Sequence, residues 1–211
     1  MQLIERYHGT MLGLAAGDAV GTTLEFRTPG SFAPINDMVG GGPFGLAAGE
    51  WTDDTSMALC LAESLVECAG FDPVDQLRRY VRWHREGYLS SNGRCFDIGN
   101  TVASALRRFE RTGEPYPGET SPNSAGNGSI MRLAPVPLAY ARTPHDAIYY
   151  SGLSSQTTHN TTAAIDGCRY LGALIVGALR GMDKAALLAP DWPPESELSG
   201  QAPLTAEIAE I

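Results

Sequence analysis

Apolar residues recur at intervals of three and four positions over most of this chain, which is the spacing of one face of a helix. The run from residue 54 to residue 69 places Met57, Leu61 and Leu65 together, and Gly70 follows it as a common stop signal. By the same reasoning we predict helices over residues 4–19, 72–85, 98–111, 144–153 and 160–180. No stretch shows the sustained alternation of a strand, so the predicted fold class is all-α.

Two Gly- and Pro-rich segments, residues 27–50 and 112–129, separate the predicted helices. Loops of that length in a compact domain are usually functional. With 211 residues, 43% of them hydrophobic, the chain can bury the core of one large domain. We therefore predict a compact multi-helix domain over residues 1–188. The Pro-rich segment 189–211 is predicted to be a tail, and the sequence leaves its structure uncertain.

Small residues recur every four positions in two of the predicted helices. Gly9, Gly13 and Gly17 share one face, and Gly172 and Ala173 lie with Gly177 on another. A glycine inside a helix costs about 1 kcal/mol relative to alanine, a cost that is tolerable where two helix backbones approach closely. We therefore expect tight helix crossings at both faces.

The charge of the chain narrows the classes of partner. A formal net charge of -9 argues against a surface that binds nucleic acid or an anionic membrane. It does not exclude a small ligand that carries phosphate, because divalent cations can invert the charge of a site locally.

The cysteines and the apolar segments indicate a cytoplasmic protein. Cys60, Cys68, Cys95 and Cys168 lack CxxC spacing and lie in apolar or helical contexts, so we interpret them as reduced packing residues. The N-terminus has no signal-peptide pattern, and the most apolar stretch, residues 170–179, is too short to span a bilayer.

Three hard oxygen donors, Thr52, Asp53 and Asp54, lie together where a loop enters a predicted helix. Two interpretations remain open for this segment taken alone. Thr52 or Asp53 would serve as a helix N-cap, with acidic groups complementing the helix dipole. Alternatively, the adjacent carboxylates would bind a cation that relieves their repulsion.

Three further polar side chains have two interpretations each. Glu25 lies between Leu24 and Phe26, and a carboxylate there either points to solvent or is held in a site. Asp97 precedes a predicted helix and would cap it or take part in a site. His159 opens the last long helix, where it would cap, pack or contact a ligand.

The segment Gly126-Asn127-Gly128-Ser129 is flexible enough for backbone amides to approach an anion. It lacks the lysine of a P-loop and follows no predicted strand, so it is neither a P-loop nor a Rossmann turn. A plain turn is equally compatible with these residues.

Taken in order, the motifs resemble the ADP-ribosylglycohydrolase family, and within it the dinitrogenase reductase-activating glycohydrolase branch. The resemblance runs from about residue 8 to about residue 180. It rests on Gly13-Leu14-Ala15-Ala16-Gly17-Asp18-Ala19-Val20-Gly21 with Glu25-Phe26, Trp51-Thr52-Asp53-Asp54-Thr55, Cys95-Phe96-Asp97-Ile98-Gly99-Asn100, Ser124-Ala125-Gly126-Asn127-Gly128-Ser129 with Leu133-Ala134-Pro135, and Thr158-His159.

The resemblance implies an all-α fold with two Mg or Mn ions at the base of a cleft. By resemblance, the metal ligands are Thr52, Asp53 and Asp54, and the catalytic residues are Asp97 and Glu25. The residues that it implies for substrate binding are Asn100, Ser124, Gly126, Asn127, Gly128, Ser129, Met131 and His159.

The implied reaction is metal-dependent hydrolysis of the N-glycosidic bond of ADP-ribosyl-arginine, which releases ADP-ribose. Such a reaction passes through an oxocarbenium-like state that needs nearby negative charge and an activated water, and the residue types fit that need. The expected partner is an ADP-ribosylated protein or a small molecule that contains ADP-ribose, and neither nucleic acid nor membrane is expected.

The chain departs from the family pattern after Gly181. Family members carry a second acidic motif of the type Gly-Asp-Thr-Asp-Thr that supplies the remaining metal ligands, and nothing like it follows Gly181 here. We therefore expect a C-terminally truncated domain that binds metal weakly. The alternatives are a non-catalytic ADP-ribose-binding module, or a degenerate fragment that reuses the scaffold as a structural protein.

Overall fold

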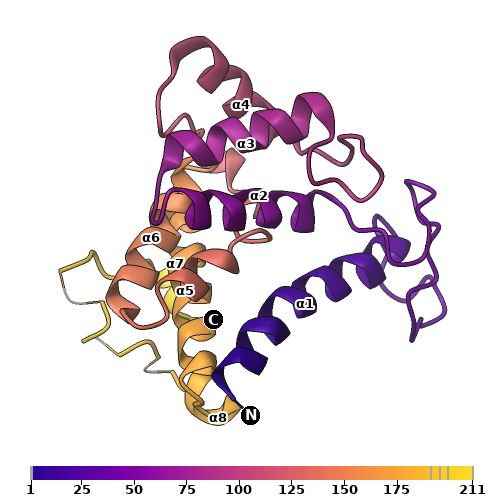
Figure 1. The fold of residues 1–211 in the computed structure, drawn as a ribbon. Coiled ribbons are helices and arrows are strands. Elements are labelled where there is room, and N and C mark those ends of the chain that lie inside the picture. Colours follow the sequence, from indigo (N-terminus) through magenta and orange to yellow (C-terminus); the bar gives the residue numbers. More distant parts are fainter. Residues whose placement is uncertain (1, 191, 195, 199, 211) are drawn as a thin grey trace.

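The computed structural model describes residues 2–190, 192–194, 196–198 and 200–210, and helices dominate them (Figure 1). Within these residues the structure has no strand, only the isolated bridges Gly41–Leu46 and Glu119–His159. The all-α prediction is therefore confirmed. The helices are α1 (Leu3–Gly21), α2 (Asp53–Glu67), α3 (Pro73–Glu86), α4 (Asn100–Thr112), α5 (Pro135–Ala139), α6 (Pro144–Gln156), α7 (Thr162–Leu179), α8 (Lys184–Leu187) and α9 (Ala206–Ala209). Short 3-10 turns cover Thr22–Leu24, Pro122–Ser124 and Asn127–Ser129.

Every helix predicted from the apolar spacing is present, with ends that shift by a few residues. The short helices α5, α8 and α9 were not predicted. Helix α5 contains Pro135 and Pro137, which usually signal a break. In a five-residue helix both prolines lie where the backbone N–H has no helical partner, so they cost little there.

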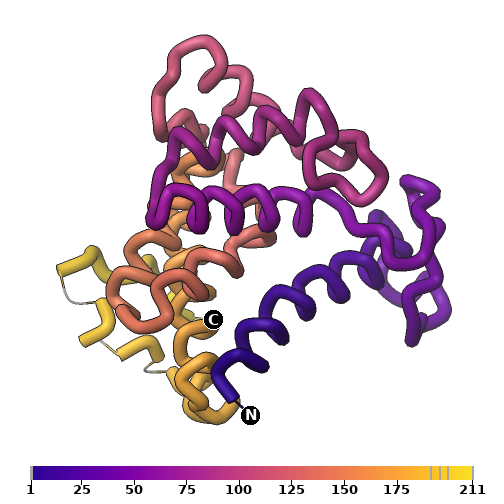
Figure 2. Tube along the Cα trace, viewed as in Figure 1, coloured from indigo at the N-terminus to yellow at the C-terminus, as the bar shows by residue number. Residues whose placement is uncertain are grey.

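The helices form two groups that share one core. Figure 1 shows α2, α3 and α4 stacked in one group, α5, α6 and α7 in the other, and α1 running diagonally beside both. The chain trace in Figure 2 places the segment between α1 and α2 beyond the C-terminal end of α1. Helix α1 contacts both α2 and α7, and hydrogen bonds from Thr52 and Thr55 to Asp18 bring its C-terminal end to the start of α2.

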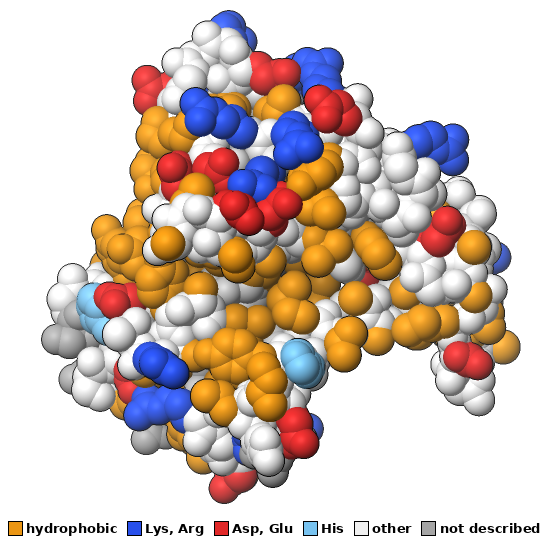
Figure 3. All heavy atoms as spheres, in the orientation of Figure 1, with side chains coloured by type: hydrophobic (Ala, Val, Ile, Leu, Met, Phe, Trp, Pro, Cys, Tyr) orange, Lys and Arg blue, Asp and Glu red, His pale blue; other side chains and the backbone are white. Residues whose placement is uncertain are grey.

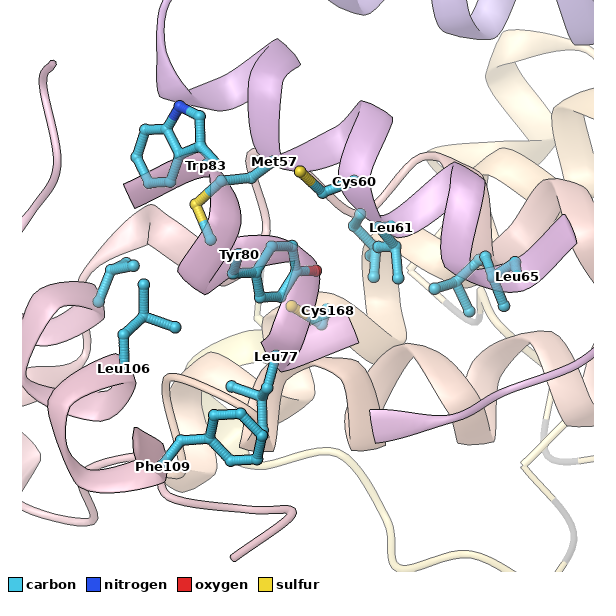
Figure 4. Packing of buried hydrophobic residues seen from close by; sticks show 13 residues of the cluster. Met57, Cys60, Leu61, Leu65, Leu77, Tyr80, Trp83, Leu106, Phe109 and Cys168 are labelled. Atoms are coloured by element: carbon cyan, nitrogen blue, oxygen red, sulfur yellow. The ribbon is translucent and has the colours of Figure 1, made fainter. Parts of the chain in front are cut away.

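The core lies where α2, α3 and α4 meet. Figure 4 shows Met57 and Leu61 of α2 packed with Leu77 and Tyr80 of α3 and with Leu106 of α4. Each of these side chains is completely buried. Full burial of such a side chain stabilises a fold by about 1.5–3 kcal/mol relative to exposure, so this cluster is the main rigid support for the loops that enter α2 and α4.

The predicted close approach of glycine-bearing helices is confirmed in α7. A Cβ added to Gly172 would clash with Ser151 of α6, and one added to Gly177 would clash with Leu187 and lie 2.8 Å from Trp192. The α6–α7 pair is the most extensive helix contact in the described part of the chain. Here the missing side chains let the two backbones come together.

The same prediction is wrong for α1. Gly9, Gly13 and Gly17 are exposed, and no other part of the described chain lies within 4 Å of a Cβ added to any of them. Leu12 on the same helix is 68% exposed. Hydrophobic side chains gather around α1 on the face of the molecule in Figure 3. The prediction fails because the spacing of the glycines identifies one face of the helix but does not show whether another segment packs on that face.

The exposed glycine face of α1 and the packed glycine face of α7 predict opposite effects of one added methyl group on stability. We expect Gly13→Ala to raise the free energy of unfolding of the 211-residue chain by about 0.5–1 kcal/mol, because alanine is the better helix former and meets open space. Gly172→Ala should lower it by about 1–3 kcal/mol, because Ser151 must move. Urea denaturation of both variants tests this pair. A destabilised Gly13→Ala chain would mean that another surface covers α1.

The described residues of the 189–211 segment are attached to α7. Ile208 of α9 is buried, the guanidinium of Arg169 donates to the carbonyl of Ala202 at 2.5 Å, and the amide of Thr205 donates to Asp166 at 2.9 Å. Asp166 and Arg169 also form a buried ion pair at 2.8 Å. The Pro-rich tail therefore packs as a cover on this helix.

The full length of α7 exceeds the apolar stretch 170–179. By length and composition alone the 18 residues of Thr162–Leu179, with a mean hydropathy of 1.3, would suffice to cross a membrane. The helix packs against α1, α5, α6, α8 and α9, and it carries the buried Asp166–Arg169 pair. Those contacts are typical of a core helix.

All four cysteines are free thiols. Cys60 and Cys168 are completely buried, as expected of packing residues, and Cys95 is half-buried. The expectation is wrong for Cys68, whose side chain is exposed because it follows the last turn of α2.

Candidate active site

A cleft of about 480 Å³ opens where α1, the start of α2, the start of α4 and the Gly126–Gly128 loop meet. All of the site residues predicted from the sequence line it, except Ser124 and Ser129. They are Glu25, Thr52, Asp53, Asp54, Asp97, Asn100, Gly126, Asn127, Gly128, Met131 and His159. Segments more than a hundred residues apart in the chain therefore share one cavity.

Asp18 holds the start of α2 in place. From the last turns of α1, its carboxylate accepts hydrogen bonds from the amide and hydroxyl of Thr52 and from the amide and hydroxyl of Thr55, at 2.7–3.1 Å. Thr52 occupies the N-cap position of α2, but its side chain makes no capping hydrogen bond. Asp18 caps α2 from a distance, which leaves Asp53 and Asp54 facing the cleft.

No role in the site was predicted for Asp18 from the sequence. An N-cap normally lies next to its helix, whereas Asp18 lies 34 residues before Thr52. The available signal was its position inside the Gly17-Asp18-Ala19 segment of the family-like motif.

Asp97 is held in a strained backbone conformation. Its φ of +59° lies in the left-handed region, which costs a residue with a side chain about 1–2 kcal/mol. The N-cap of α4 is Gly99, so the capping interpretation of Asp97 is wrong. Strain of this kind often accompanies a functional position, and here the side chain lines the cleft.

Burial, and then mutual repulsion, raise the pKa values of the acidic side chains in the cleft. Burial, and then the charges of Asp97 and Asp54, raise the pKa of Asp53 to about 9. Burial, and then the charges of Asp18 and Glu25, raise the pKa of Asp54 to about 6. Burial, and then the charge of Glu25, raise the pKa of Asp97 to about 7, and burial also raises the pKa of Glu25. The site therefore concentrates more negative charge than it can compensate by itself.

A hard divalent cation fits the chemistry of this donor set. The hydroxyl of Thr52 donates its hydrogen to Asp18 at 2.8 Å, so its lone pairs stay available, and the Asp53 and Asp54 carboxylates beside it lack a cationic partner in the described part of the chain. The described residues offer too few ligands for a complete metal site. Within the described residues, no group of three or more His, Cys, Asp and Glu side chains is arranged to hold a metal ion.

The Gly126–Gly128 loop also lines the cleft and packs on His159. A Cβ added to Gly128 would lie 2.8 Å from Cε1 of His159 and 3.0 Å from Val102, so only glycine fits there. His159 is 2% exposed and does not cap α7, because that role belongs to Thr161. The packing interpretation and the ligand-contact interpretation of His159 are thus compatible.

Ser124 and Ser129 lie outside the cleft lining. Ser124 is half-buried in the turn Pro122–Ser124. Ser129 is buried, and its hydroxyl accepts from the Cys168 thiol at 3.5 Å and donates to the hydroxyl of Ser155 at 2.9 Å, because the Ser155 hydrogen goes to the carbonyl of His159. Their predicted contact with a substrate stays a prediction.

The burial of His159 predicts a pH dependence of stability. Burial, and then the charge of Arg132, lower the pKa of His159 to about 4 from an ordinary 6.5. Between these values the unfolded chain binds more protons than the folded one, so the contribution of His159 is complete above pH 6.5 and is lost as the pH falls toward 4. We expect His159→Gln to remove part of this loss in urea titrations at pH 4–7. His8→Gln, at an exposed histidine, is the control, and an equal change in both variants would contradict the prediction.

Comparison with known proteins gives one consistent result. A sequence model described as ADP-ribosylglycohydrolase matches residues 1–211. The ADP-ribosylarginine hydrolase Tri1 of Pseudomonas putida (strain GB-1) is 50% identical over 189 residues, which are 90% of this chain and 51% of that protein. The ADP-ribosyl-[dinitrogen reductase] glycohydrolase of Rhodospirillum rubrum is 35% identical over 178 residues, which are 81% of this chain and 57% of that protein.

One solved structure is similar to this chain in both fold and sequence. The structure titled "ADP-ribosylglycohydrolase-related protein complex" matches with a TM-score of 0.78 and 44% identity, and the match covers 89% of this chain and 60% of that one. The chain thus spans about half the length of the curated relatives it matches.

Proposed function

Because the chain belongs to the ADP-ribosylglycohydrolase family, we propose that it supplies the cleft in which ADP-ribosylated arginine is hydrolysed to free ADP-ribose. The observation that carries the proposal is the convergence of four carboxylates on the cleft that the Gly126–Gly128 loop and His159 also line; they are Glu25, Asp53, Asp54 and Asp97. Two relatives named ADP-ribosylarginine hydrolase, at 50% and 43% identity, support the choice of arginine.

The chemistry needs negative charge and a proton acceptor beside the anomeric carbon. As the bond to the guanidino nitrogen breaks, positive charge develops on the ribose ring, and the carboxylates of the cleft stabilise it. We assign Asp97 or Glu25 as the general base that removes a proton from the attacking water. Their raised pKa values bring these groups nearer to neutral pH, where a general base works best.

We further propose that Thr52, Asp53 and Asp54 would hold divalent cations, two ions of Mg or Mn, as the family resemblance implies. When bound, such ions orient ribose hydroxyls and lower the pKa of a bound water. The support within this chain is the charge of the donor set and the available lone pairs of Thr52.

One measurement tests the reaction directly. The purified 211-residue chain is incubated with ADP-ribosylated arginine in the presence of Mn, of Mg or of a chelator, and released ADP-ribose is quantified. We expect release that depends on the metal. Release that is unchanged by the chelator would contradict the metal assignment while leaving the hydrolase assignment in place.

A non-catalytic ADP-ribose-binding module is the second candidate. It is favoured by the incomplete ligand set of the described residues. It predicts that the folded chain binds ADP-ribose in calorimetry and releases none from the arginine conjugate. Absence of both binding and release would contradict both candidates.

A further inference from the structure

We propose that Arg132 is a positioning residue that acts through Thr158 to fix His159 in its neutral tautomer with the hydrogen on Nε2. In that form Nε2–H is a donor aimed into the cleft beside Gly126 and Gly128. Its partner would be an acceptor oxygen of the ribose or diphosphate of the ligand. The identity of that ligand rests on the proposed function, whereas the tautomer does not.

Arg132 is completely buried and has no carboxylate partner in the part of the chain that the structure describes. Its guanidinium donates to the carbonyl of Gly128 at 2.7 Å, to the hydroxyl of Thr157 at 3.0 Å and to that of Thr158 at 2.8 Å. It also lies 4.7 Å from the centre of the Tyr80 ring. A buried charge is costly unless hydrogen bonds satisfy it, so these neighbours are held firmly around it.

These contacts join the two segments that form one wall of the cleft. Gly128 belongs to the glycine-rich loop, and Thr158 immediately precedes His159. The amide of His159 is fixed as well, since it donates to the carbonyl of Ser155 at 2.7 Å, and the hydroxyl of Ser155 donates to the carbonyl of His159 at 2.8 Å. The backbone of His159 therefore has little freedom, and the remaining variable is where the ring carries its hydrogen.

The hydroxyl of Thr158 determines which ring nitrogen of His159 carries the hydrogen. A guanidinium only donates, so Thr158 Oγ1 must accept from Arg132. The same oxygen lies 2.9 Å from Nδ1 of His159, which is the acceptor that the structure offers to the hydroxyl hydrogen. If Nδ1 carried a hydrogen, two donors would face this oxygen and its own hydrogen would have no acceptor in a completely buried residue. Nδ1 is therefore the acceptor, and Nε2 carries the hydrogen.

The other ring nitrogen faces the cleft. A Cβ added to Gly126 would lie 3.6 Å from Nε2, and His159 lines the cleft together with Gly126, Asn127 and Gly128. Within the described residues Nε2 has no hydrogen-bond partner of its own. The low pKa of His159, about 4, keeps the ring neutral at physiological pH, so the tautomer determines whether the cleft meets a donor or an acceptor.

The tautomer is measured on the metal-free 211-residue chain labelled with ¹⁵N-histidine, from the two ring-nitrogen shifts of His159 at pH 7. We expect Nε2–H in the wild type and in Thr158→Ser, which keeps the hydroxyl, and loss of that preference in Thr158→Val. Thr157→Val is the matched control, because it removes a hydroxyl that also accepts from Arg132 but does not contact His159. An Nδ1–H tautomer in the wild type, or a Thr158→Val spectrum identical to the wild type, would overturn the proposal.

Binding of free ADP-ribose to the same variants tests the donor role. We expect Thr158→Val to weaken binding about three- to tenfold in calorimetry, and Thr157→Val and Thr158→Ser to leave it within about twofold. Unchanged affinity in Thr158→Val, with the tautomer altered, would overturn the donation to the ligand. A wild type with the expected tautomer and no affinity for ADP-ribose would overturn the proposed ligand and leave the tautomer assignment in place.

Discussion

Replacing Asp97 by Asn is expected to lower the turnover of ADP-ribosylated arginine by at least about a hundredfold. The change removes one of the two carboxylates that we assign to proton transfer, and it also removes negative charge that stabilises the positive charge on the ribose. It keeps the size of the side chain. Asn is also one of the few residues that tolerate the left-handed backbone found at this position, φ +59°, so the loop need not rearrange.

Measurements of stability and of ligand binding distinguish the loss of turnover in Asp97→Asn from a loss of structure. The charge of Asp97 raises the pKa of Asp53, so removing that charge relieves repulsion in the folded state. The melting temperature of Asp97→Asn should therefore be unchanged or slightly higher, and free ADP-ribose should bind within a few-fold of the wild type. Steady-state kinetics, thermal unfolding and calorimetry on one preparation measure all three.

Glu25→Gln is the matched control. It neutralises the other candidate base, which lines the same cleft. The variant with the larger loss of turnover identifies the base, because both changes remove one negative charge. Turnover near the wild-type level in both variants would contradict the assignment of a carboxylate base to this pair.

The helices of this fold could be predicted because each carries its own signal. The apolar spacing of α2, α3 and α4 is local and is reinforced by stop signals such as Gly87, whose φ is +68°. Which segment packs on a given helix face depends on residues far away in the chain, so the sequence of the helix itself does not predict it. Similar spacing of small residues in α1 and α7 predicts two tight crossings. Among the described residues only α7 has one, because α6 packs there.

The site could be predicted only as a set of residues. The acidic pair at the start of α2 and the glycine-rich loop are visible as motifs, but nothing in a sequence places them in the same cleft. The resemblance to a family made that connection, and the cleft contains both motifs. Hydrogen bonds over long sequence distances stayed hidden, and the contacts of Asp18 and Arg132 are the two clear cases.

Asp18→Ala is expected to lower the free energy of unfolding by about 2–4 kcal/mol. The carboxylate of Asp18 accepts hydrogen bonds from the amides and hydroxyls of Thr52 and Thr55, and both threonines are buried. Alanine leaves these donors without an acceptor. Relief of the repulsion that Asp18 exerts on Asp54 offsets only part of that cost, because Asp54 is already partly protonated near neutral pH.

Asp72→Ala is the control that separates long-range anchoring from ordinary capping. Asp72 accepts from the amides of Val74 and Asp75 at the start of α3, and loss of such a local cap costs about 1 kcal/mol. Asp18 also joins α1 to α2, so Asp18→Ala should cost more in urea denaturation and should weaken Mn²⁺ binding, whereas Asp72→Ala should leave Mn²⁺ binding unchanged. Equal losses of stability would mean that Asp18 acts as a cap only. Intact Mn²⁺ binding in Asp18→Ala would show that Asp53 and Asp54 keep their positions without it.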